Sequence, residues 1–167
     1  MEKIADDMSG LLNETLGFYK ELKVLLEAEK KYITDMDVQK LWDSTDRKKQ
    51  IVESIESMIA RILDRVKTYV SDFEMDVRSF RVREVVAVLP LKMRIKSGLK
   101  TIGLKIDGLK HEIGLMANEN KRYILEYLSV IDGVFSTIKQ RPDQDQYSSY
   151  GRILSSNETT RLINAEV

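Results

Sequence analysis

Three long stretches of the chain place an apolar residue at every third or fourth position. They run from Met8 to Ile33, from Leu41 to Phe73 and from Met93 to Ile138. This spacing puts the apolar side chains on one face of an α-helix and the charged side chains on the other. A period held for so many turns indicates helices that lie against one another. We therefore predict an all-α fold, an elongated antiparallel bundle of three or four long helices with coiled-coil-like packing.

The interruptions between the stretches set the expected limits of the helices. Asp37 is a good N-cap, because its carboxylate can accept the free amide protons of the next turn. Pro90 ends the run that precedes it and can begin the following helix. Ser71 and Glu74 have the spacing of a capping box, which allows a break inside the second stretch. We expect helices over about 6–34, 37–80 and 91–139, within a bundle that spans residues 1–140.

A local repeat lies inside the third stretch, where Gly98, Gly103 and Gly108 are each followed by Leu-Lys. Each glycine costs about 1 kcal/mol of helix stability relative to alanine. A step of five residues rotates around the helix, so the glycines do not share one face. We interpret the repeat as a soft part of the helix, and its continuity as a helix is left open.

The character of the chain changes after Ile138. Residues 139–149 are polar, contain Pro142 and have no apolar period, which is typical of a linker. Residues 141–167 are therefore predicted to be a linker and a mobile C-terminal segment. The residues beyond Gly151 could form a short amphipathic helix, but an isolated helix of this length is marginal in water. The apolar stripes can cover one another, but the tail's apolar residues have no such cover and suit recognition of a partner helix. They are Ile153, Leu154, Leu162 and Ile163.

The charges balance over the whole chain, with 27 basic and 27 acidic residues. This neutrality gives no global attraction to nucleic acid or to an anionic membrane. Locally the charges are uneven, because residues 1–46 carry eleven acids and six bases, whereas residues 92–110 carry six bases and one acid. We expect the two segments to lie near each other and partly neutralise. The alternative is that residues 92–110 form a docking stripe for an acidic partner.

Candidate chemistry is scarce. The chain has no cysteine and a single histidine, His111, so no ligand set for a metal can be assembled from these residue types. No phosphate-binding loop is present, and the acidic pair Glu27 and Glu29 falls on a predicted solvated face. We expect no enzyme activity and no cofactor. Trp42 is either a core residue or an exposed contact.

The first residues lack the basic and apolar pattern of a secretory signal, and no window reaches 18 apolar residues in a row. The sequence therefore predicts a cytoplasmic protein without stable membrane insertion.

Three groups of residues occur in an order that is known from one protein family. The first group, in the first two stretches, is Leu25, Leu26, Glu29, Ile33, Asp37, Leu41, Lys48 and Ile51. The second group, late in the third stretch, is Asn118, Glu119, Asn120, Ile124, Leu125 and Leu128, and the third group, beyond that stretch, is Tyr147 to Arg152. In this order the residues resemble the FlgN family of flagellar type III export chaperones. The resemblance covers roughly residues 8–154 and departs from the family at Ala117 and at the Gly-Leu-Lys repeats.

The resemblance implies a cytoplasmic chaperone for the hook-associated proteins of the hook–filament junction. Such a protein binds the terminal helix of its client, prevents premature assembly and delivers the client to the type III export gate or its ATPase. The family's C-terminal segment is implied to hold the client, through Ile153, Leu154, Leu162 and Ile163. Tyr147 matches the tyrosine that contacts the export gate, with Tyr150 as a close competitor. The expected state is a monomer or a homodimer.

Two other functions are compatible with the same pattern. A structural coiled-coil adaptor would self-associate through the long stripes as a stable dimer or tetramer. A binder of nucleic acid or of acidic ligands would use Lys92 to Lys110, and its binding would fall steeply with added salt.

Overall fold

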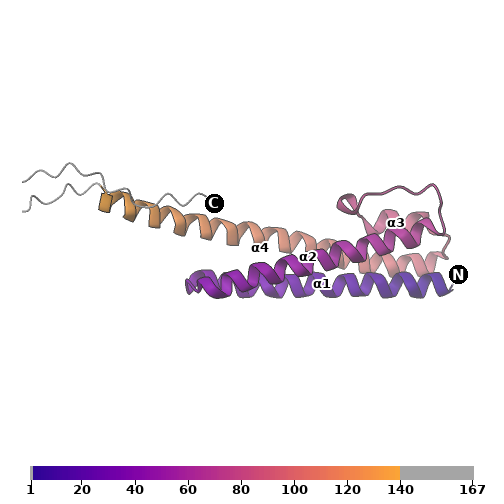
Figure 1. Ribbon diagram of the computed structural model, residues 1–167. Coiled ribbons are helices and arrows are strands. Elements are labelled where there is room, and N and C mark those ends of the chain that lie inside the picture. The colour runs from indigo at the N-terminus through magenta and orange to yellow at the C-terminus, as the bar shows by residue number, and fades with distance from the viewer. Residues whose placement is uncertain (1, 140–167) are drawn as a thin grey trace, which may run out of the picture. The chain divides into compact units, whose positions relative to one another are not determined.

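The computed structural model describes residues 2–139, and this part of the chain is all-helical, as predicted. Its elements are α1 (Glu2–Thr34), α2 (Val38–Lys67), a short 3-10 helix η1 (Val77–Ser79), α3 (Val82–Val88) and α4 (Met93–Lys139). Helices α1 and α2 run side by side in opposite directions, and α3 lies near the end of this hairpin where the chain begins (Figure 1). No helix in residues 2–139 is both long and apolar enough to cross a membrane.

The hairpin turn between α1 and α2 is built by the backbone. The N–H of Met36 donates to the carbonyl of Ile33 at 3.1 Å, and that of Asp37 donates to the carbonyl of Tyr32 at 3.0 Å. These are the two bonds of a Schellman motif, in which the residue after the helix adopts a left-handed conformation. Met36 has a φ of 52° and takes the position that glycine usually fills. Asp37 caps α2 as predicted, because its carboxylate accepts from the N–H of Lys40 at 3.1 Å.

Helix α2 ends at Lys67, earlier than the predicted limit at residue 80. The N–H of Tyr69 turns back to the carbonyl of Val66 at 2.9 Å, which closes the last turn. The apolar period continues past this point only because Phe73 and Val77 still pack against the core from irregular backbone and from η1. The period therefore identifies the buried face correctly but not the end of the helix.

The core of the unit formed by residues 1–125 combines all four helices. Three valines of α3 are buried, and Leu89 and Leu91 on either side of Pro90 are buried with them. Leu89 is extended, with a ψ of 138°, as expected before a proline. The buried apolar residues of α1 and α2 repeat every three or four positions, which is the pattern that predicted them. They are Ala5, Met8, Leu11, Leu12, Leu16, Tyr19, Leu22, Leu26, Ile33, Ile51, Ile55, Met58, Ile59, Ile62, Leu63 and Val66.

Helix α4 is continuous through the Gly-Leu-Lys repeat, and the three glycines have different surroundings. A Cβ atom added at Gly103 would lie 2.8 Å from Cβ and Cγ1 of Val82, whereas Gly98 and Gly108 have open space. Val82 is fully buried at the start of α3, so it has little room to move away. Gly103 therefore permits the close approach of α3 to α4.

Contacts between Cα atoms divide helix α4 between two compact units. The first unit ends at Leu125, and Glu126 to Lys139 belong to the second. The predicted linker and mobile segment, residues 141–167, lie outside the described residues, so the predicted domain boundary stays a prediction. Side chains 126–138 of the second unit include no buried residue.

Alanine substitution of the three glycines tests the contact between α3 and α4. We expect Gly98→Ala and Gly108→Ala to raise the free energy of unfolding by up to about 1 kcal/mol, because alanine favours the helix. Gly103→Ala should instead lower it by about 1–3 kcal/mol, the usual cost of overpacking a core. Urea unfolding followed by circular dichroism measures both effects. A Gly103→Ala protein as stable as the Gly98→Ala protein would contradict this account.

Candidate protein-binding surface

The residues that the sequence assigned to client and gate binding lie outside the part of the chain that the structure describes. These residues are Tyr147, Tyr150, Ile153, Leu154, Leu162 and Ile163. Their assignment stays a prediction. Within residues 2–139 a different surface has the properties of a protein-binding site.

This surface is the apolar face of α4 in the second unit. At about 100° per residue, its six large apolar side chains fall within an arc of about 160° around the helix. The remaining arc carries small or polar residues, including Ser129, Asp132 and Ser136. The relative exposures in this row, which we name the α4 apolar face, are Leu128 52%, Val130 66%, Ile131 46%, Val134 54%, Phe135 58% and Ile138 61%.

The exposure of this face differs from the sequence interpretation, in which the three apolar stripes cover one another. The third stripe is covered only in its first part, where Leu99 and Ile106 are buried. Scattered exposed apolar residues are ordinary, but a contiguous apolar row on one helix face is typical of an interaction site.

A buried polar cluster lies in the first unit, where α4 meets the hairpin. Glu29 of α1 is only 3% exposed, and its carboxylate accepts hydrogen bonds from Nζ of Lys48 in α2 and, at 3.1 Å, from Nδ2 of Asn120 in α4. Asn120 also donates to the backbone carbonyl of Leu26 at 2.9 Å. Three helices therefore share one polar contact, which we name the Glu29 cluster.

The Glu29 cluster forms the polar floor of an apolar groove of about 350 Å³ between α1, α2 and α4. Such a volume is in the range of sites that accept several apolar atoms. Two residues of the wall remain accessible, because Val52 is 42% and Leu125 is 55% exposed. The groove therefore offers a second apolar contact to a partner. Its walls are Leu22, Leu26, Val52, Ile113, Ala117, Ile124 and Leu125, with Lys121 beside Glu29, Lys48 and Asn120.

The sequence placed Glu29 on a solvated face, and this was wrong. The signal that could have corrected it is the presence of polar residues within apolar stripes, because Lys48 and Asn120 both occupy stripe positions. A buried polar residue at such a position needs a partner of complementary chemistry. Trp42 is 67% exposed and therefore does not belong to the core. His111 is exposed, and residues 2–139 contain no group of acidic, histidine or cysteine side chains that could hold a metal ion.

The acidic and basic segments lie near each other, as expected, because Asp6 and Ser9 of α1 line the same cavity as Ile95 and Gly98 of α4. Direct ion pairs join other residues. Acids of α1 pair with bases of α2, as in Asp7 with Arg65 at 2.7 Å, and α4 supplies the acids for Lys23, through Glu112 at 2.8 Å, and for Lys30. None of the six basic residues between 92 and 110 makes an ion pair with a described residue.

Next to the Glu29 cluster, Glu119 contacts two groups that favour its charged form. Lys30 donates a hydrogen bond to Glu119 at 3.1 Å and lowers the pKa of this carboxyl, and Tyr123 adds a second hydrogen bond. Because the pKa of Glu119 is lower in the folded protein than in the unfolded chain, the contact stabilises the fold at pH values above the ordinary pKa of a glutamate. This stabilisation is lost as the pH falls through the lowered pKa of Glu119. The group is exposed, so this contact makes a small contribution.

Lys48→Met tests the Glu29 cluster. Breaking a buried ion pair costs about 3–5 kcal/mol, and we expect about 2–3 kcal/mol here because the Lys48 side chain is 27% exposed. The matched control is Arg47→Met, which removes an exposed pair with Glu21 and should cost less than about 1 kcal/mol. The double variant Glu29→Gln/Lys48→Met should recover most of the loss. Equal urea midpoints for Lys48→Met and Arg47→Met would rule out the proposed importance of the cluster.

A comparison of the chain with protein-family models, with curated proteins and with solved structures finds no match in any of the three.

Proposed function

We propose that this chain is a helical binding protein that acts as a cytoplasmic flagellar export chaperone for hook-associated proteins. It holds a terminal helix of its client until the client reaches the type III export gate. The observation that carries the proposal is the α4 apolar face, with six large side chains exposed between residues 128 and 138. The motifs that resemble the FlgN family are the reason for proposing hook-associated proteins as the client.

The chemistry of the α4 apolar face supports the binding of an amphipathic helix. Its arc is wide enough to bury the apolar stripe of one partner helix, and such helix-on-helix contacts use anchors at spacings of three, four and seven residues. Phe135 and Ile131 lie four residues apart near the middle of the face, where truncation usually costs most. Chaperoning of this kind requires only differential binding, so no catalytic group is needed.

The same face supports one alternative, a self-associating coiled-coil adaptor. Leu128, Ile131, Phe135 and Ile138 follow one another at steps of three, four and three residues, which is the spacing of a heptad seam. This row covers only two heptads, which is short for a stable coiled coil by itself. The adaptor therefore ranks second.

Substitution of the centre of the face tests the proposal. Ile131→Ser/Phe135→Ser should weaken binding of the purified hook-associated proteins of the same organism by at least about thirtyfold, because two central apolar anchors are lost. Isothermal titration with the full chain measures the change. The control Val24→Ser/Val38→Ser alters two apolar residues of the first unit that are 63% and 61% exposed, and it should leave the affinity unchanged.

Two results would contradict the chaperone. One is the absence of measurable binding to any hook-associated protein. The other is a stable dimer or tetramer in light scattering that Ile131→Ser/Phe135→Ser converts to monomer, which would establish the adaptor instead.

The predicted role of the tail is tested by deletion of residues 153–167. We expect the melting temperature and the helical circular dichroism to stay nearly unchanged while client binding is lost, because the deletion removes the four apolar residues assigned to the client. Retention of full affinity by the truncated chain would overturn this assignment and place the client on the α4 apolar face alone.

A further inference from the structure

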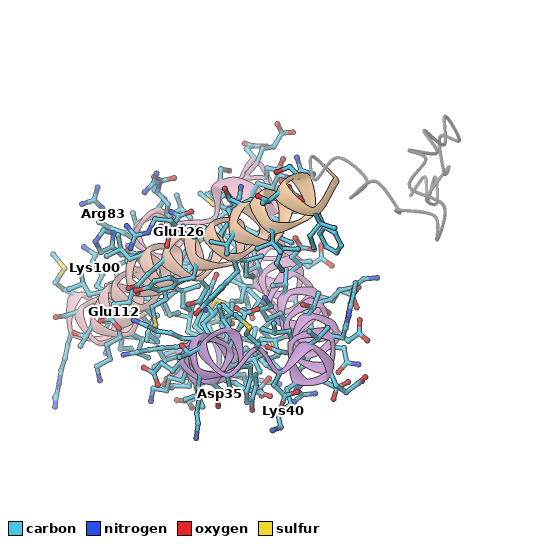
Figure 2. All side chains as sticks on the ribbon, turned by 90° about the vertical axis from the view of Figure 1, so that its left-hand side faces the viewer. Asp35, Lys40, Arg83, Lys100, Glu112 and Glu126 are labelled. Atoms are coloured by element: carbon cyan, nitrogen blue, oxygen red, sulfur yellow. The ribbon has the colours of Figure 1, made fainter. Side chains whose placement is uncertain are left out.

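A cluster of cations lines a cavity on another part of the first unit. Arg81 and Arg83 from the start of α3 and Lys100 from α4 line a cavity of about 280 Å³, together with Gly103, Leu104 and Asp107. Figure 2 labels Arg83 and Lys100 on the same side of the helices. We name this set the basic cavity, and nothing in the proposed chaperone function uses it.

The packing of α3 on α4 brings these cations together. The contact between Gly103 and Val82 sets the distance of the two helices, and Nζ of Lys96 donates to the carbonyl of Ala87 at 2.8 Å, which ties the last turn of α3 to α4. The cations are therefore held on two elements of fixed relative position. Clustering like charges is unfavourable by itself, so their arrangement calls for a compensating anion.

The described residues supply only part of that compensation, because the lining holds one acid, Asp107, beside three cations. Arg83 and Lys100 make no ion pair within residues 2–139, and Arg81 reaches only Glu84, at 3.8 Å. Both members of that pair are largely exposed, with 72% and 53% of their side chains accessible, so the pair contributes little. The basic cavity thus keeps most of its positive potential.

The composition of the cavity selects the kind of anion. Leu104 lies among the cations with 72% of its surface exposed, which offers an apolar contact that a phosphate backbone would not use. The lining contains no aromatic residue on which a base could stack. From the geometry we infer that the basic cavity binds an acidic protein segment in which a leucine-like side chain stands beside carboxylates.

A designed peptide probe tests this inference on the full chain. The probe is a synthetic helical peptide of glutamate and leucine, and fluorescence anisotropy at low ionic strength measures its binding. Arg83→Glu/Lys100→Glu should weaken binding by about tenfold or more, since both cations face the probe. Leu104→Ser should weaken it by about fivefold through the lost apolar contact. Amide chemical shifts should change at residues 81–84 and 100–107.

Matched controls separate local recognition from general electrostatics. Lys20→Glu/Lys49→Glu makes the same change of net charge at exposed residues of α1 and α2 outside the cavity and should alter the affinity by less than about twofold. The same peptide with serine in place of leucine should bind wild type about as weakly as the normal peptide binds Leu104→Ser. An equal loss in the two charge-reversal variants, or no binding of the probe to wild type, would overturn the inference.

A mixed-sequence single-stranded oligonucleotide provides the last comparison. It should bind more weakly than the peptide, and its binding should respond equally to both charge-reversal variants. Tighter binding of the oligonucleotide, lost specifically in Arg83→Glu/Lys100→Glu, would show a nucleic-acid site and overturn the assignment to an acidic protein segment.

Discussion

The burial of the Glu29 carboxylate constrains how α1, α2 and α4 pack against one another. A charge removed from water is tolerable only when other groups replace its hydration, and here Lys48 supplies a cation and Asn120 an amide donor. Each of the three residues comes from a different helix. Sliding α4 along the hairpin by one turn would remove Asn120 from both of its acceptors and leave the carboxylate with one donor fewer. The Glu29 cluster therefore fixes the register of α4 against α1 and α2, a task that uniform apolar packing performs poorly.

Much of this arrangement could be predicted from the sequence. The period of apolar residues identified the helical class, and Asp37 and Pro90 marked two of the breaks correctly. The end of α2 was missed because Phe73 and Val77 stay near the core without being in that helix. The close contact at Gly103 was missed because helix propensity reports only that a glycine lowers the stability of a helix. It does not report that Val82 lies too close for a side chain at this position. Burial of Glu29 depends on residues distant in the sequence. Lys48 and Asn120 occupy stripe positions, which indicates that they face the core, but this pattern does not identify Glu29 as the partner that they share.

The surface of the described residues carries three candidate binding sites that differ in chemistry. They are the exposed α4 apolar face, the apolar groove beside the Glu29 cluster, and the basic cavity, in which three cations face one carboxylate. They differ in the physical force that would recruit a ligand, so salt should weaken binding at the basic cavity while leaving the apolar surfaces largely unaffected.

The α4 apolar face also has a consequence for the behaviour of the protein in different solvents. Ions that are excluded from protein surfaces, such as sulfate, raise the free energy of apolar groups in water and so favour their removal from it. Six large side chains on one helix face will respond together, whereas the isolated exposed side chains elsewhere respond singly. Within residues 2–139, this face should therefore lose contact with water readily in concentrated sulfate, and self-association should begin there.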